Sequence, residues 1–292
     1  MKLGFLASVL IVGLATALPI SGRQPSPIAE NLPQDGDTLL NSPPDGAFST
    51  VIEEAVNALD QAVRGFIDSV KMVVGSLTKS LSDIGKVDPE RIGVLGICAS
   101  GGYTSYVAQS DTRIKALGTV SAACVGRMTR NGGLYESNNK ESPEAIAGAL
   151  KAAGDWRTAH ANDTQTQAPR MFETEASAVP EDSPSFFKSA VAYDGTKCGH
   201  HARSDQRVPP SIYDLMIGYD SFIYQHLISP RPLLMIAGTE AETLHHSKTA
   251  VEGARDPKEL FIVKGKNHFD LYDNFIESAP KLVEFYANAL AQ

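Results

Sequence analysis

Cys98 lies in a sequence setting that favours nucleophilic chemistry. It follows an apolar, glycine-containing run at residues 91–97 and precedes a segment of helical character. Gly96 and Ser100 on either side of it are small. This pattern is typical of a nucleophile elbow, a sharp strand-to-helix turn that lifts a reactive side chain above the end of a parallel sheet. The turn would place Cys98 at a helix N-terminus, where the helix dipole and free amides favour a thiolate. The pattern therefore predicts an acyl hydrolase or acyltransferase that uses a cysteine.

Two alternatives to this interpretation exist. In a second register Ser100 would be the nucleophile, between Cys98 and Gly102. Strand length favours Cys98, because the run at 92–97 leads directly into it, whereas Ser100 would lie two residues into the helix. Cys98 could also be a structural residue, since a free cysteine packs as a small hydrophobic side chain.

A base and an acid can be proposed from two later strand-like runs. Residues 229–238 are apolar, begin with prolines and end at Gly238, and Glu240 and Glu242 follow. Residues 258–265 predict a last strand, and His268 comes just after it. The order nucleophile, acid, histidine, with the last two on loops after successive strands, is one of the known orders of catalytic triads. We therefore expect His268 to act as general base, with one of the two glutamates as its partner.

Three segments together resemble the α/β-hydrolase superfamily: residues 88–103, 228–238 and 266–273. Within it the chain is most similar to the dienelactone-hydrolase-like branch with a Gly-x-Cys-Ala-Ser-Gly-Gly-Tyr elbow, which includes the fungal fumagillin polyketide transferase family. The likeness covers roughly three quarters of the chain. It implies Cys98 as nucleophile, His268 as base and an acid after Gly238. Relatives often have an Asp four residues beyond that glycine, where this chain has Glu242, and Glu240 is the alternative acid.

The expected mechanism is acyl transfer through a thioester. A free thiol has a pKa of about 8.5, and pairing with His268 at a helix N-terminus would lower it. Attack on an ester or thioester gives an acyl-enzyme that water or an alcohol resolves, and the Ala99 amide would donate to the oxyanion. The resemblance implies a role in fungal-type polyketide biosynthesis, with a small or carrier-bound acyl substrate. The alternatives are a dienelactone-type carboxylester or lactone hydrolase, or an impaired, truncated homologue that acts as a binding protein.

The expected fold is an α/β-hydrolase-like parallel sheet, truncated at its N-terminal side, with a helical lid at about residues 128–228. Related enzymes have further strands before the elbow, and one of them leads to the second oxyanion donor. Without them the elbow strand would be an open edge, which favours a homodimer. The predicted strands are 92–98, 116–121, 232–237 and 259–264. The lid contains a helical stretch at Pro143–Ala153 and aromatic residues for an acyl pocket: Trp156, Phe172, Phe186, Phe187, Tyr193, Tyr213 and Tyr219.

The N-terminus predicts a secretory leader. Residues 1–17 combine a lysine, an apolar run and a small-residue cleavage pattern at Ala15-Thr16-Ala17. Residues 18–47 are rich in Pro, Asp and Ser and predict a spacer, and the domain would extend over 48–292, beginning with helical periodicity at 48–81. The glycosylation sequon at Asn162 agrees with a secreted protein. The alternative location is the cytoplasm.

Charge and cysteine usage exclude other classes. The net charge of −8 and the absence of a basic stripe in the sequence argue against nucleic acid and anionic membranes as partners. The sequence shows no phosphate-binding glycine loop and no Cys/His spacing for zinc, so we expect no cofactor and no metal. Cys124 and Cys198 could form a disulfide or remain two thiols. The pairs His200-His201 and His245-His246 are expected to be solvated loop residues.

Overall fold

The computed structural model describes residues 8–12, 88, 90–161, 166–170, 179–194, 196, 199 and 207–291. Several predictions lie outside these residues: the spacer at 18–47, the helix within 48–81, Phe172, Cys198, His200-His201 and the sequon at Asn162. Among the helices that are described, none is long and apolar enough to cross a membrane.

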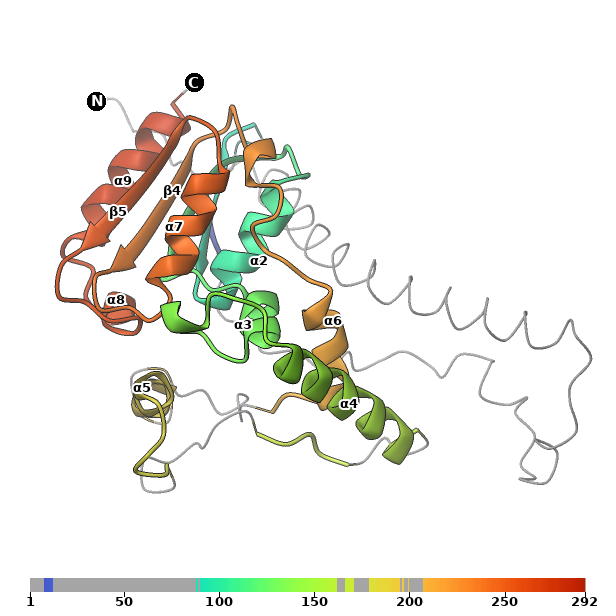
Figure 1. Ribbon diagram of the computed structural model, residues 1–292. Helices are drawn as coiled ribbons and strands as arrows, with labels where there is room; N and C mark the ends of the chain where they lie inside the picture. Colours follow the sequence, from blue (N-terminus) through green and yellow to red (C-terminus); the bar gives the residue numbers. More distant parts are fainter. Residues whose placement is uncertain are drawn as a thin grey trace, which may run out of the picture. The chain divides into compact units, whose positions relative to one another are not determined.

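The centre of the fold is a parallel sheet of five strands in the order β1-β2-β3-β4-β5 (Figure 1). Its strands are β1 (Ser8–Val12), β2 (Ile92–Ile97), β3 (Ile114–Val120), β4 (Leu233–Gly238) and β5 (Lys258–Val263). β4 is buried at every residue, as expected of a parallel strand covered on both faces. The predicted α/β architecture with a parallel sheet is confirmed.

Strand β1 pairs with the elbow strand β2, from Ser8 opposite Ile92 to Val12 opposite Gly96. The prediction that β2 forms an open edge is therefore wrong, and a homodimer through that edge loses its basis. Among the described strands, the edges of the sheet are β1 and β5. β1 lies within the segment that was predicted to be a leader. The two interpretations overlap because a short apolar run is typical of a strand as well as of a signal peptide.

Helices cover both faces of the sheet. α2 (Ala99–Ala108) and α7 (Leu244–Gly253) lie on one face, and α9 (Ser278–Ala289) lies on the other (Figure 1). Side chains along β2 point alternately to the two faces of the sheet, and the nearest neighbours of two of its glycines show which helix covers each face. A Cβ added at Gly93 would meet the ring of Tyr286 in α9 at 2.6 Å, and one at Gly96 would meet Thr104 Oγ1 in α2 at 2.2 Å. Glycine at 96 thus permits the close approach of strand and helix that an elbow needs.

An apolar core lies between the sheet and α9. Its fully or nearly buried members are Leu95, Val120, Leu234, Ile236, Val263 and Leu271, and Leu282 and Phe285 of α9 pack against them. Tyr286 crosses this layer, and its hydroxyl donates to the carbonyl of Val94 in β2 at 2.6 Å. This bond ties α9 to the strand that ends at Cys98.

The predicted lid is present as a helical insertion between β3 and β4. It contains α3 (Val125–Asn131), η3 (Glu136–Asn138), α4 (Pro143–Ala159), α5 (Ser185–Asp194), η5 (Pro210–Ile212), α6 (Tyr213–Ile217) and η6 (Gln225–Leu227). The helix predicted at Pro143–Ala153 is confirmed, and the Ser142 hydroxyl caps it by accepting from Ala145 N–H. α3, α4 and α6 pack together, whereas α5 lies apart from them, near the short α8 (Asp270–Asp273) (Figure 1).

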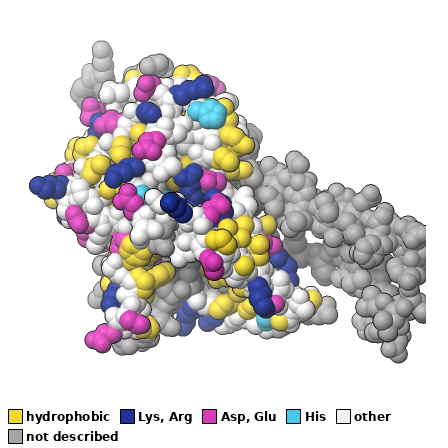
Figure 2. Space-filling view, viewed as in Figure 1, with side chains coloured by type: hydrophobic (Ala, Val, Ile, Leu, Met, Phe, Trp, Pro, Cys, Tyr) yellow, Lys and Arg dark blue, Asp and Glu magenta, His cyan; other side chains and the backbone are white. Residues whose placement is uncertain are grey.

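The surface carries charges of both signs. Figure 2 shows Lys and Arg side chains interspersed with Asp and Glu over the visible face, with no stripe of one sign. Several of these charges form ion pairs, for example Arg127 with Asp220 at 2.8 Å. The visible face thus shows no concentration of one sign of charge.

Candidate active site

Cys98 occupies a strained turn between β2 and α2. Its backbone φ of 58° and ψ of −128° lie in a region that costs a non-glycine residue about 1–3 kcal/mol. Three backbone hydrogen bonds hold it there: its N–H donates to Val120 at 3.1 Å, and its carbonyl accepts from Gly101 and Ala123, both at 2.9 Å. The predicted strand–Cys98–helix turn is confirmed. Ser100 lies inside α2 and is buried, so it does not occupy the turn.

His268 is delivered to the same end of the sheet by the loop after β5. The Asn267 side chain shapes this loop by accepting from the N–H groups of Phe269 and Asp270, both at 2.9 Å. Ser121, another residue with a positive φ (48°), donates its hydroxyl to the His268 carbonyl at 2.9 Å. His268 is completely buried. Cys98 and His268 therefore come together as predicted, both at the carboxyl end of their strands.

A third side chain stands between them. The Tyr272 hydroxyl is 2.7 Å from Nε2 of His268 and lies close enough to the Cys98 thiol to lower its pKa. On the other side of the imidazole, Nδ1 is 2.7 Å from the hydroxyl of Thr243. The four groups form one continuous chain, Cys98–Tyr272–His268–Thr243. The sequence analysis missed both hydroxyls, although the spacing of four between His268 and Tyr272 was a signal that they could meet within one helical turn.

The structure does not bring either predicted acid to His268. The Glu242 carboxylate accepts from the hydroxyl of Ser185 at 3.1 Å, and the Glu240 carboxylate accepts from Thr239 at 3.1 Å. Thr243, one residue further along, takes the position at Nδ1 instead. A threonine hydroxyl can orient the imidazole, but it carries no charge to stabilise an imidazolium as a triad carboxylate does.

The electrostatics of the site favour neutral groups. Cys98 keeps part of its surface accessible, yet protein atoms crowd its thiol, and this burial raises the pKa of Cys98. Hydrogen bonds from Tyr272 and the Ala99 N–H work in the opposite direction and are outweighed. Burial also lowers the pKa of His268 to about 3. The expected lowering of the thiol pKa is therefore not found, and the resting site holds a thiol and a neutral imidazole.

Helix α5 of the lid covers this site with aromatic side chains. The Phe186 ring lies edge-on to the His268 ring with centroids 5.1 Å apart, and Tyr193 lies 5.2 Å from Tyr272. Asp194 at the end of the helix is half-buried; burial raises its pKa, and its charge in turn raises the pKa of Cys98. Of the aromatic residues predicted to line an acyl pocket, Phe186 and Tyr193 lie at the site, whereas Trp156 stacks on His160 within α4.

Two curated proteins are similar to this chain in sequence. No protein-family model matches the chain. Uncharacterized protein YcjY of Escherichia coli strain K12 is 29% identical over 221 residues, which cover 74% of this chain and 70% of YcjY. Uncharacterized protein PA2218 of Pseudomonas aeruginosa is 31% identical over 202 residues, 66% of this chain and 51% of PA2218. The chain thus spans about half the length of PA2218.

Solved structures decide the fold. The crystal structure of PA2218 superposes with a TM-score of 0.66 at 28% identity, covering 74% of this chain and 66% of that one. The alpha/beta hydrolase GrgF from Penicillium sp. sh18 superposes with a TM-score of 0.57 at 18% identity, covering 76% of this chain and 73% of GrgF. This protein has the α/β-hydrolase fold.

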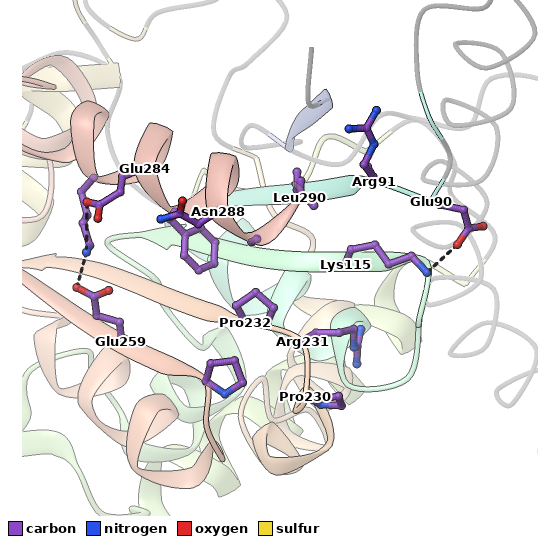
Figure 3. Close-up of a pocket in the computed structure, with 14 residues that line it drawn as sticks. Glu90, Arg91, Lys115, Pro230, Arg231, Pro232, Glu259, Glu284, Asn288 and Leu290 are labelled. Atoms are coloured by element: carbon purple, nitrogen blue, oxygen red, sulfur yellow. Dashed lines mark ion pairs between the residues drawn. The ribbon is translucent and has the colours of Figure 1, made fainter. Parts of the chain in front are cut away.

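In the α/β-hydrolase fold the reactive groups lie beyond the carboxyl ends of the strands. In this protein a groove lies at the opposite end of the sheet (Figure 3). This groove has a volume of about 650 Å³ and is lined by residues at the starts of the strands and by α9. Its charges include two ion pairs, Glu90 with Lys115 at 3.2 Å and Glu259 with Lys281 at 2.7 Å. Because Cys98 and His268 are not among its lining residues, we do not assign the chemistry to it.

A second buried histidine lies near the site. His246 in α7 accepts the backbone N–H of Cys124 at its Nδ1, at 3.2 Å, so the expectation of a solvated loop histidine is wrong. Cys124 is a free thiol whose sulfur accepts from the Ser221 N–H at 3.2 Å, and its predicted partner Cys198 lies outside the described residues. In the part of the chain that the structure describes, no three His, Cys, Asp or Glu residues are grouped as metal ligands would be.

The two buried histidines predict acid sensitivity. Burial lowers the pKa of both His246 and His268 to about 3, against about 6.5 in the unfolded chain. Below pH 6.5 the unfolded state binds more protons, so stability falls as the pH falls from there to 3, by about 1.4 kcal/mol per pH unit for each histidine. Urea unfolding at a series of pH values should show this slope.

A variant pair isolates the contribution of His246. His246→Asn keeps an acceptor for the Cys124 N–H but cannot be protonated, so its free energy of unfolding should fall less steeply with pH, by about 1.4 kcal/mol per unit. His226→Asn changes a half-exposed histidine of η6 and is the matched control for the loss of a histidine side chain. Equal slopes in all three proteins would show that His246 is not a buried neutral group.

Proposed function

We propose that this protein is an α/β-hydrolase-type enzyme that transfers or hydrolyses acyl groups, with Cys98 as nucleophile and His268 as base. The observation that carries the proposal is the turn at Cys98. Its backbone is held at a φ of 58° by three hydrogen bonds, at the start of α2 and within one intervening hydroxyl of a buried histidine. Strain of this kind persists where the surrounding structure enforces it, which is common at reactive residues.

The proposed reaction has two halves. The Cys98 sulfur attacks the carbonyl carbon while the thiol proton moves toward His268; the bond to the leaving group then breaks, and the leaving group takes up that proton. Water or an alcohol attacks the resulting thioester, gives its proton to the base, and releases the acyl product and the free thiol. The Ala99 N–H, which lies close enough to the thiol to lower its pKa, supports the negative oxygen that develops. Thr243 orients the imidazole in the place we had expected Glu242 or Glu240 to fill.

The proposed substrate is an ester or thioester with an apolar acyl chain. The rings of Phe186 and Tyr193 over the site provide apolar surface of the kind that lines acyl pockets. A polyketide acyl group, free or bound to a carrier, is the specific substrate that the sequence resemblance suggests, and a carboxylester or lactone of the dienelactone type is the alternative.

Two observations favour a second candidate function. The thiol has a raised pKa, and the Nδ1 partner of His268 is a hydroxyl, so the site lacks the charge that activates most cysteine nucleophiles. These features suit a homologue that binds an acyl compound without turning it over. A covalent intermediate distinguishes the two functions, because only the enzyme forms one.

Trapping the acyl-enzyme tests the proposal. The protein is mixed with p-nitrophenyl acetate or an acyl thioester of N-acetylcysteamine, quenched in acid, and digested for peptide mass spectrometry. We expect an acyl group on Cys98 that neutral hydroxylamine removes, as a thioester requires. The buried Cys124 in the same sample is the internal control and should stay unmodified. A wild-type protein without an adduct on Cys98, with both the esters and the thioesters, would contradict the enzyme proposal.

A further inference from the structure

The position of Tyr272 separates this site from a direct cysteine–histidine pair. Its hydroxyl is 2.7 Å from Nε2 of His268 and lies beside the Cys98 thiol, close enough for each group to shift the pKa of the other. It therefore fills the place through which a proton must pass from the sulfur to the base. The chain ends at Thr243, whose hydroxyl can donate to Nδ1 or accept from it, so the imidazole can take either neutral tautomer.

Packing holds the Tyr272 ring in this place. Tyr272 donates its backbone N–H to Phe269 at 2.9 Å, at the first turn of α8. Its ring meets those of Tyr193, Phe269 and His268 edge to face, with centroids 5.2, 5.3 and 5.5 Å apart. Rings packed on three sides cannot swing aside without opening the lid, so the hydroxyl stays between the sulfur and the base.

We propose that Tyr272 is a catalytic residue that relays the proton between Cys98 and His268. As the sulfur bonds to the acyl carbon, the thiol proton passes to the Tyr272 oxygen and the original phenol proton passes to Nε2 of His268. When the leaving group departs, it takes a proton from the Tyr272 oxygen, and the proton on Nε2 restores the phenol. Atoms and charge balance, and no other reactant is needed. The inference rests on the proposed function in taking Cys98 as the nucleophile.

The surroundings favour a relay in which both protons move together. A phenolate at 272 would be costly, because burial raises the pKa of Tyr272 well above its usual range. Tyr272 of α8, Asp194 of α5 and Tyr103 of α2 interact electrostatically with the thiol, and His246 of α7 interacts in the same way with His268. Among these groups, Tyr272 is the one that is hydrogen-bonded to the base. Concerted transfer avoids a phenolate, and the positive charge that forms on His268 is matched by the negative oxygen that develops on the acyl carbon.

Alkylation of Cys98 by iodoacetamide measures the relay directly, without any acyl substrate. Rates are read by peptide mass spectrometry over a range of pH for the wild type, Tyr272→Phe, His268→Ala and the double variant. If Tyr272 is the relay, each single change breaks the same path. We expect each to slow alkylation about tenfold or more at neutral pH, to move the pH profile to higher pH, and the double variant to lose no more than either one.

Two outcomes would overturn the relay. If Tyr272→Phe reacts at the wild-type rate or faster, the Tyr272 hydroxyl is not needed for proton transfer, and the Cys98 thiol and His268 exchange the proton directly. If the losses of the single variants multiply in the double variant, the two residues act independently. Tyr286→Phe removes another buried tyrosine hydroxyl, one bonded to Val94 far from the thiol, and should keep the wild-type profile.

A fluorinated tyrosine at position 272 covers the case in which Tyr272→Phe does not fold. The substitution keeps the ring and makes the phenol more acidic, so its oxygen accepts the thiol proton less readily and its O–H donates more strongly to Nε2. The alkylation profile should therefore differ from that of the wild type, and an unmoved profile would contradict the relay. The two proposals fail separately. If the wild-type protein forms no acyl adduct, the proposed enzyme activity is wrong. If the wild type is acylated and the Tyr272→Phe variant is acylated equally fast, only the relay is wrong.

Discussion

Replacing Cys98 by alanine is expected to lower kcat/KM for p-nitrophenyl ester hydrolysis by about a thousandfold or more. Removal of the nucleophile from a hydrolase site leaves only the rate supplied by binding and oxyanion donors. The change removes one sulfur atom and keeps the backbone, whose turn is held by hydrogen bonds of the main chain. The loss should therefore appear in activity while the melting temperature stays close to that of the wild type.

Two further variants make this test specific. Cys98→Ser keeps a hydroxyl beside Tyr272, but a serine needs a stronger base than a thiol does, and His268 has Thr243 in place of a carboxylate at Nδ1. We expect Cys98→Ser to be nearly as slow as Cys98→Ala. Cys124→Ser, which keeps an acceptor for the Ser221 N–H, should remain active. Hydrolysis at the wild-type rate by Cys98→Ala would place the reaction at another residue.

The body of the sheet was predictable because its strands leave a strong local signal. β2, β4 and β5 are short apolar runs bounded by glycine or proline, and each lies within about one residue of its predicted position. The turn at Cys98 was predictable for a related reason: Gly96 and the small residues after it permit the close approach of strand and helix that the motif describes. Parallel strands then bring Cys98 and His268 to one end of the sheet.

The partners of His268 were not predictable in the same way. Glu242 is one residue from Thr243, and the start of α7 decides which of the two side chains turns toward the imidazole. That choice depends on the path of a loop in three dimensions, which no spacing rule fixes to one residue. The raised pKa of Cys98 likewise comes from the crowding of the thiol by residues distant in the chain. The motif alone suggested a lowered value.

Strand β1 shows how one sequence signal can fit two structures. The run at residues 3–18 satisfies the composition of a leader, and Ser8–Val12 within it also pairs with β2 along its length. Because the strands are parallel and Val12 lies opposite Gly96, the chain leaves β1 at the same end of the sheet as Cys98. Secretion remains a prediction. If a signal peptidase cleaved the chain after Ala17, the sheet would lose β1.

Deleting residues 1–17 is therefore expected to destabilise the protein severely. The deletion leaves β2, buried at five of its six residues, with unpaired backbone groups along one edge. An exposed apolar edge strand pairs with other chains, so we expect loss of soluble monomer in size-exclusion chromatography and a melting temperature lower by about 10 °C or more for the monomer that remains.

Deleting only residues 1–7 is the matched control, because it removes part of the same apolar run and keeps all five residues of β1. This shorter deletion should stay monomeric and melt close to the full chain. If both deletions behave like the full chain, pairing of β1 does not stabilise the sheet, and the segment could be removed as a leader without loss. If only the longer deletion aggregates, β2 depends on β1, and so does the turn that presents Cys98. Acyl trapping on Cys98 in the longer deletion should then fail with the fold.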